Sequence, residues 1–191
     1  VTAFGLVIGQ VPLPNGEEPG AVIGAVDPAT AEQVFAFRMA SGTVADLQPG
    51  QIVVDRQVAK QQDLAPGDRL TVLGTSGESL ELTVGPISDD PALLGQWTIT
   101  RADAATLVRQ PTDALLGLTL DRGVTPESVR PALKNQLTNY PTMTLQDRDQ
   151  YTSSLISSIS ALLNVIYGLL AVSILIALIG IANTLSLSIH E

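Results

Sequence analysis

An uncharged, apolar run near the C-terminus constrains this chain more than any other feature. From Val165 to Ile189 the sequence VIYGLLAVSILIALIGIANTLSLSI contains no Asp, Glu, Lys or Arg over 25 residues. A helix rises 1.5 Å per residue, so the run would be about 37 Å long. The hydrocarbon core of a bilayer is only about 30 Å thick. The run therefore predicts a transmembrane helix over 165–189, with the lipid bilayer as a partner.

The helical pattern begins before this run, at about Asp147. Apolar residues recur at spacings of three and four while Ser and Thr occupy the other side, which is typical of an amphipathic helix. We expect an amphipathic stalk helix over 147–164 that continues into the span as one rod. The apolar positions of this pattern are Tyr151, Leu155, Ile159, Leu162, Ile166 and Leu170.

Small and polar residues inside the run are the candidate site residues of the chain, for packing against another membrane helix. Rows of small residues four apart allow two helices to approach closely, and a polar amide such as Asn183 is costly to expose to lipid. The alternative is that small residues simply occur in any membrane helix. The candidate packing residues are Ser173, Ala177, Gly180, Asn183, Thr184 and Ser188.

The charged residues lie almost entirely before the apolar run, and the absence of cysteine is compatible with an exported as well as a cytosolic domain. Residues 1–149 contain all ten basic and eighteen of the nineteen acidic residues, and the chain has no cysteine. An acidic surface argues against nucleic-acid binding, which requires basic patches. We expect residues 1–150 to be extracytoplasmic, the C-terminus to be cytoplasmic, and the protein to lie in the cell membrane. We expect no signal peptide, because no basic n-region is followed by an apolar h-region. We also expect the sequence to be a fragment, because it begins without a Met and stops directly after the apolar run.

Alternating apolar runs and turns before the stalk predict an α+β fold. Asp27, Asp55 and Thr100 are expected helix N-caps, and residues 69–73 and 79–84 flank a Gly-rich turn typical of a hairpin. Residues 115–145 read as strand–helix–strand, a βαβ-like unit with its last strand at 142–145. We expect an α/β subdomain formed by 1–46 and 112–146, and a β-rich insert formed by 47–111.

The sequence offers no enzyme signature, and we predict no catalytic, cofactor or metal site. The only histidine, His190, follows the apolar run, so a Ser-His-Asp mechanism lacks a base in the polar part of the chain. No phosphate-binding P-loop is present, and Gly74–Gly77 is expected to be a hairpin turn. The pairs Glu17-Glu18 and Asp89-Asp90 are expected to be solvated loop residues. Trp97 is expected in the core, with a ligand-facing role as the alternative.

Two stretches of the chain resemble the FtsX/MacB-like permease subunits of ABC transporters. The segment Ile179–Thr184, IGIANT, followed by His190-Glu191, is similar to the second membrane helix of these permeases and the cytoplasmic turn after it. The pattern Ile52–Asp55, then Val58-Ala59, then Leu64–Val72 is similar to a motif of their extracytoplasmic domain. The resemblance covers nearly the whole chain, and it implies an extracytoplasmic domain with an α/β subdomain and a β-rich insert.

The resemblance implies a permease subunit that couples ATP hydrolysis by a partner ATPase subunit or domain to motion outside the cytoplasm. It also implies a second permease copy, as a homodimer or heterodimer, and an extracytoplasmic protein or lipid as substrate. Export, lipid, lipoprotein or peptide transport, and regulation of cell-wall enzymes all remain open. A single-pass anchored binding or adhesion domain is the alternative, and an anchored hydrolase that uses acidic residues is a third.

Overall fold

The computed structural model describes residues 1–13, 16–75, 77–109 and 112–189; within these ranges, the side chains of 16–19, 148, 152, 154–162 and 180–189 are not described. The chain divides into two compact units, an N-terminal unit Val1–Thr119 and a C-terminal unit Leu120–Glu191. Mixed α+β structure agrees with the fold class expected from the sequence.

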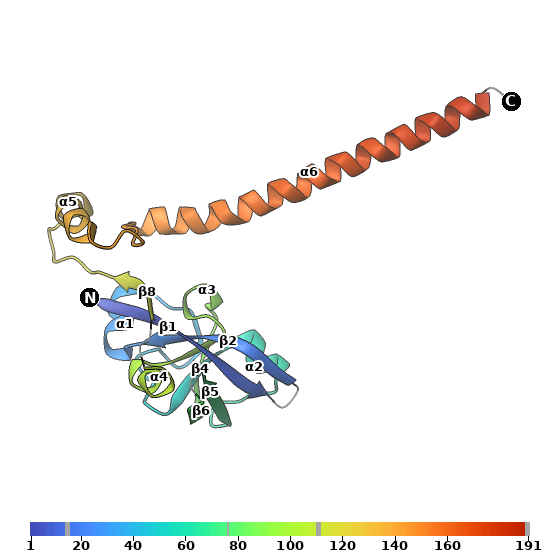
Figure 1. The fold of residues 1–191 in the computed structure, drawn as a ribbon. Coiled ribbons are helices and arrows are strands. Elements are labelled where there is room, and N and C mark those ends of the chain that lie inside the picture. The colour runs from blue at the N-terminus through green and yellow to red at the C-terminus, as the bar shows by residue number, and fades with distance from the viewer. Residues whose placement is uncertain (14–15, 76, 110–111, 190–191) are drawn as a thin grey trace. The chain divides into compact units, whose positions relative to one another are not determined.

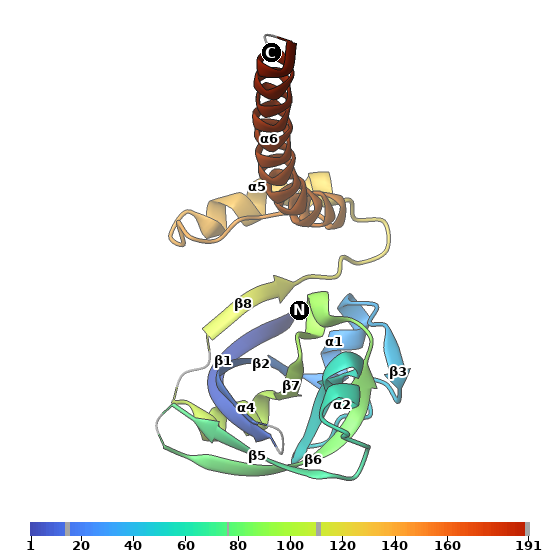
Figure 2. The same ribbon diagram turned by 90° about the vertical axis from the view of Figure 1, so that its right-hand side faces the viewer.

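The described strands of the N-terminal unit join one sheet that closes on itself (Figures 1 and 2). Six of them follow each other around the ring in the order β1, β2, β7, β4, β6 and β5, and the β5–β1 and β1–β2 pairings complete it. The β2–β7 and β4–β6 pairs are parallel and the other four are antiparallel. The remaining strands lie at edges, where β8 pairs with β1 and β3 with β6. The strands are β1 Thr2–Leu13, β2 Gly16–Val26, β3 Met39–Ser41, β4 Gln51–Asp55, β5 Arg69–Gly74, β6 Ser79–Ser88, β7 Trp97–Thr100 and β8 Thr112–Gly117.

Glycines allow strand β1 to bend around the ring. The pairing of β1 with β2 contains a bulge between Gly9 and Val11. At the same place β1 also pairs with β5, through Gly9 and Gly74. A Cβ on Gly9 would lie 2.7 Å from the carbonyl oxygen of Leu73, and a Cβ on Gly74 would overlap that of Leu107. Bulges bend a strand and increase its twist, and glycine permits such close approach of two backbones. Closure of the sheet therefore depends on the absence of side chains here.

Four short helices of the N-terminal unit connect the strands, and three of them have the caps that the sequence predicts. Asp27 accepts a hydrogen bond from the backbone N–H of Ala29 (3.1 Å), and Asp55 accepts one from Gln57 (2.9 Å). Thr100 Oγ1 accepts one from the backbone N–H of Asp103 (3.1 Å). The helices are α1 Pro28–Val34, α2 Arg56–Gln61, α3 Pro91–Leu94 and α4 Arg101–Leu107.

Alternation along the strands divides the apolar side chains between two clusters. The larger cluster includes Val11, Ile52, Val72 and Ile99 of the ring strands, and Trp97, which is fully buried as expected. The smaller cluster lies on the other face, where Val26 and Val53 pack with residues of α1, α3 and the 44–47 turn. Because side chains of a strand point alternately to opposite faces, the same sheet contributes apolar side chains to both clusters.

The sheet bears on two sequence-based expectations. Strands from the expected α/β subdomain (1–46 and 112–146) and from the expected insert (47–111) pair with one another in the same sheet. The predicted strand at 142–145 is absent, since these described residues have turn or irregular conformation. Strand pairing depends on partners distant in the chain, which local patterns do not specify. The predicted hairpin is confirmed as β5 and β6.

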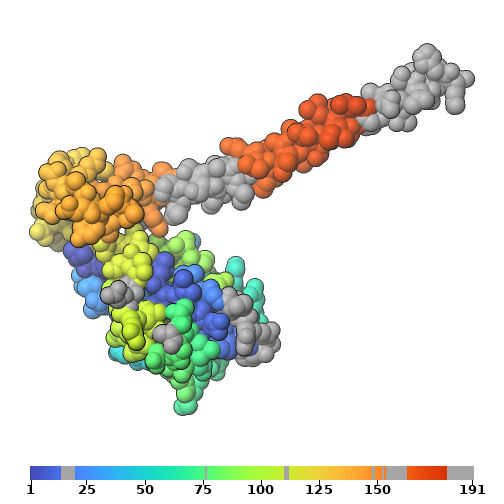
Figure 3. All heavy atoms as spheres, in the orientation of Figure 1, coloured from blue at the N-terminus to red at the C-terminus, as the bar shows by residue number. Residues whose placement is uncertain are grey.

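The C-terminal unit contains two helices, α5 Pro126–Leu137 and α6 Arg148–Ile189. α6 is one helix of 42 residues, so the expected continuity from the stalk into the apolar run is confirmed for the backbone. The side chains of 163–179, shown in red in Figure 3, are all exposed in the isolated chain. Within the described part of the chain, no helix is both long enough and apolar enough to cross a membrane.

Candidate functional site at the start of the long helix

The first turn of α6 is held by a reciprocal cap. The carboxylate of Asp147 accepts a hydrogen bond from the backbone N–H of Gln150 (2.8 Å), and the side chain of Gln150 accepts one from the backbone N–H of Asp147 (3.2 Å). The carbonyl oxygen of Asp147 also accepts from the N–H of Tyr151 (2.9 Å). This exchange resembles a capping box, in which two otherwise unpaired N–H groups are satisfied. The start of the helix is therefore defined at Asp147.

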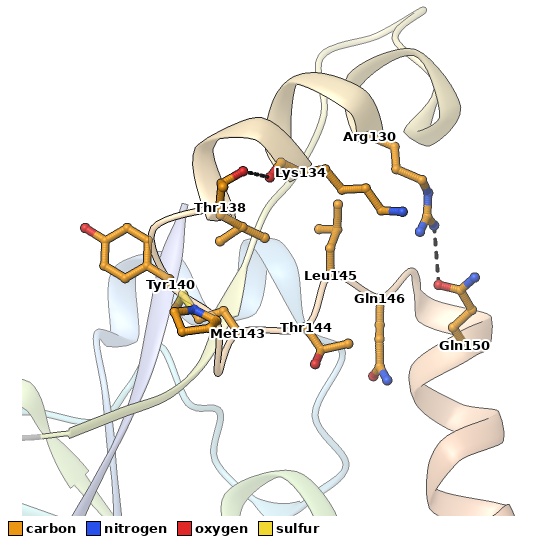
Figure 4. Close-up of a pocket in the computed structure, with 11 residues that line it drawn as sticks. Arg130, Lys134, Thr138, Tyr140, Met143, Thr144, Leu145, Gln146 and Gln150 are labelled. Carbon is orange, nitrogen blue, oxygen red and sulfur yellow. Dashed lines mark hydrogen bonds between the residues drawn. The ribbon is translucent and has the colours of Figure 1, made fainter.

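Arg130 links α5 to this cap. Its guanidinium donates to the second carboxylate oxygen of Asp147 (2.9 Å) and to the side-chain oxygen of Gln150 (3.3 Å), as Figure 4 shows for the latter. The Arg130 and Asp147 side chains are 29% and 35% exposed. Partial burial and two acceptors for one guanidinium make this contact stronger than a typical exposed ion pair. The arrangement couples the orientation of α5 to the first turn of α6.

A hollow of about 650 Å³ lies beside this contact, entirely within the C-terminal unit. Its wall consists of one face of α5, the 138–146 segment that returns from α5, and the first turn of α6 (Figure 4). Arg130 and Lys134 line it from α5, and no acidic residue is among its lining residues. On the α5 side the wall therefore carries the Lys134 ammonium group and the Arg130 guanidinium, the latter paired with Asp147. The returning segment adds apolar side chains such as Leu145.

The predicted packing residues lie on the distal part of α6. Ser173 and Ala177 are exposed and one turn apart, and the Ser173 hydroxyl donates to the carbonyl oxygen of Leu169 (2.9 Å). That bond satisfies the hydroxyl within its own helix, as is common for serine in helices. Four further candidates lie in the part of α6 whose side chains are not described: Gly180, Asn183, Thr184 and Ser188.

The acidic pairs differ from the expectation in one case. Asp90 is buried, with its carboxylate 3.4 Å from the Arg38 backbone N–H and 4.0 Å from the Arg38 Nε, so the expectation of a solvated residue is wrong there. Asp89 is half-exposed and pairs with Arg56 at 3.2 Å. The side chains of Glu17 and Glu18 and the whole of His190 lie outside the described residues. The described residues contain no group of three or more acidic, His or Cys side chains placed to hold a metal ion.

Sequence reasoning missed the Arg130 contact. The pattern Asp147-x-x-Gln150 was a readable signal for the cap, since Asp and Gln at this spacing are typical of a helix start. The role of Arg130 had no signal, because the residue lies seventeen positions before Asp147 and on another helix.

Two comparisons gave no match, since no family model and no curated protein matches the chain. Among solved structures, the chain is similar to a domain of a "putative Permease protein" from Porphyromonas gingivalis, with a TM-score of 0.48 and 16% identity over 76% of this chain and 64% of that one. It is also similar to the periplasmic region of MacB from Actinobacillus actinomycetemcomitans, with a TM-score of 0.49 and 14% identity over 72% of this chain and 65% of that one. The chain thus spans less than two thirds of each.

Proposed function

We propose that the chain is part of a permease subunit of an ABC transporter of the FtsX/MacB type. One observation carries this proposal: α6 is a single helix that begins at a capped, charged turn and continues through a run of 25 residues without a charge. The described side chains of this run, 165–179, are exposed and almost all apolar. An apolar surface all around a helix is typical of a membrane span rather than of a helix packed on a soluble core.

In this proposal residues 165–189 span the membrane, residues 1–150 are extracytoplasmic, and the C-terminal end is cytoplasmic. The acidic character of the preceding residues supports that orientation. A partner ATPase subunit or domain hydrolyses ATP, because the chain has no P-loop. Motion at the membrane passes along α6 to Asp147, and through Arg130 to α5.

The second permease copy packs against the small-residue face of α6 in this proposal. By their spacing of three and four residues in the sequence, the members of that face are Ser173, Ala177, Gly180, Thr184 and Ser188. Close approach of two backbones at small residues is a principal source of helix association in membranes. Asn183 is adjacent to this face and is expected to hydrogen-bond across it.

The test is the sidedness of two introduced cysteines. The chain has no cysteine, so Glu78→Cys in the exposed β5–β6 turn and Glu191→Cys each provide one thiol. In intact bacterial cells, a membrane-impermeant maleimide should label Glu78→Cys and should label Glu191→Cys only after the cells are permeabilised. Labelling of both sites in intact cells, or of Glu191→Cys alone, would overturn the proposed topology.

A second measurement separates a permease from a membrane-anchored binding domain. The full-length subunit, purified with its ATPase, should change the rate of ATP hydrolysis when the two are assembled. The subunit alone should show no hydrolysis above background. An ATPase whose rate is the same with and without this subunit would favour the binding domain.

A further inference from the structure

The hollow between α5 and the first turn of α6 has the chemistry of a ligand site. We propose that it binds a small amphipathic anion, a carboxylate or phosphate group attached to an apolar body. The choice of a free anion over a lipid headgroup rests on the membrane span proposed above, whereas the rest of the proposal rests on the lining residues of the C-terminal unit.

The cationic part of the site comes from two side chains on one face of α5. Arg130 and Lys134 are four residues apart, so they lie one above the other on the helix surface. Like charges at this spacing destabilise a helix unless an anion lies near both. Asp147 neutralises Arg130, but among the described residues no carboxylate pairs with the Lys134 ammonium group. Lys134 therefore offers an uncompensated charge at the edge of the hollow (Figure 4).

The apolar part of the site comes from the segment that returns from α5 to α6. Leu137 and Leu145 are half-buried at the hollow, and Tyr140 and Met143 are 59% and 39% exposed beside them. Aromatic and sulfur-containing side chains adapt to ligands of varied shape. The hollow measures about 650 Å³ and is broadly open to solvent, so it would cover a ligand on one side only. The site thus has room for a small molecule with one charged end.

The lining residues themselves favour an anion over a cation. They include Lys134 and Arg130 and no acidic residue, although Arg130 is already paired with Asp147 beside the hollow. Two cations in one hollow are too few for a nucleic acid, which requires a basic stripe. The Thr138, Gln146 and Gln150 side chains add neutral hydrogen-bonding groups around the charged end.

A free anion fits this location better than the headgroup of a bilayer lipid. Gln150 precedes Val165 by fifteen residues of continuous helix, which corresponds to about 22 Å. The headgroup layer on one side of a bilayer is only about 5–8 Å thick. If 165–189 spans the membrane as proposed above, an intact lipid in the bilayer does not reach the hollow.

Isothermal titration of the full chain, purified in a non-ionic maltoside detergent, tests the proposal with phenyl phosphate as the probe. Inorganic phosphate and phenyl glucoside are the comparison ligands, since each lacks one half of the proposed chemistry. We expect saturable binding of phenyl phosphate, at least about ten-fold tighter than either comparison ligand. No saturable binding, or equal affinity for either comparison ligand, would overturn the proposal.

The chain offers a matched control variant, since Lys60 is its only other lysine and lies exposed on α2 in the other unit. Lys134→Gln should weaken phenyl phosphate binding about ten-fold, and Lys60→Gln should change it less than two-fold. Equal effects of the two variants would show that the charge of Lys134 does not form the site. Phosphatidylglycerol added to the micelles should leave the affinity for phenyl phosphate unchanged. If this lipid competes with phenyl phosphate, then the site binds a lipid headgroup rather than a free anion, and the proposal is overturned.

Discussion

Removal of the Asp103 carboxylate should destabilise the N-terminal unit more than any exposed ion pair can. Asp103 is buried in the first turn of α4, and its two oxygens accept from the backbone N–H of Gly50 at 3.2 and 3.0 Å. One oxygen also accepts from the Thr100 hydroxyl at 2.8 Å. Asp103→Ala leaves both donors without this acceptor, and each unsatisfied buried group costs about 1–3 kcal/mol. We therefore expect the free energy of unfolding to fall by about 3 kcal/mol.

Trp97 makes this change measurable, because it is the only tryptophan and is fully buried in the larger cluster. Its fluorescence in a urea titration reports unfolding of the N-terminal unit alone. With a slope of about 1.5 kcal/mol per molar urea, the Asp103→Ala midpoint should fall by about 2 M. Asp103→Asn retains one acceptor oxygen and should have an intermediate effect.

The matched control is Glu81→Ala, which also removes a carboxylate from this unit. The ion pair of Glu81 with Arg69 spans 3.1 Å, but the two side chains are 61% and 80% exposed. Solvent screening limits such pairs to roughly 0–1 kcal/mol, so the midpoint should change little. If Asp103→Ala lowers the midpoint no more than Glu81→Ala does, then the Asp103 contacts do not hold the 48–51 turn to α4.

Three further predictions concern the ring and the long helix. Gly74→Ala should destabilise the N-terminal unit by about 2–3 kcal/mol in the same urea assay, because its Cβ would overlap a backbone carbonyl of α4. Gly67→Ala, with open space but φ +101°, should cost only about 1 kcal/mol, and equal effects would contradict the close approach. Ala177→Leu should reduce crosslinking between permease copies, whereas Ala171→Leu on the opposite helix face should not. Equal crosslinking of the two variants would exclude the face that contains Ala177 from the interface. Ser158→Pro interrupts α6 at a cost of about 3 kcal/mol and should abolish coupled ATP hydrolysis and transport in the full-length protein. Ser158→Ala should leave both activities unchanged. Normal transport by the proline variant would show that α6 does not transmit the motion.

Features that depend on a few adjacent residues were predictable from the sequence. The caps at Asp27, Asp55 and Thr100 were correct because a capping side chain reaches only two or three residues along the chain. The β5–β6 hairpin and the 42-residue helix α6 were correct for the same reason, since each follows one unbroken local pattern.

Features that depend on distant partners were not predictable. The expected strand at 142–145 is absent, because an apolar run alone does not determine whether a sheet edge is available to it. Asp90 looked like a loop residue, but burial beside Arg38 depends on a chain segment some fifty positions away. For the candidate site, the Asp147 cap was readable in the sequence, whereas the contact from Arg130 required α5 and α6 to be folded together.

The sequence by itself determined the local conformations of this protein: where helices begin, which strands form a hairpin, and that one helix runs from the stalk into the apolar run. The proposal of a membrane span likewise rests on the charge-free run in the sequence. Only the tertiary structure decided that strands from both ends of the N-terminal unit close into one ring, with parallel β2–β7 and β4–β6 pairs. It likewise decided that Arg130 and Lys134 line a hollow beside the start of α6. The physical reason is that hydrogen bonds within a helix or hairpin join neighbours in the chain, whereas sheet closure and pocket walls join residues that only the folded backbone brings together.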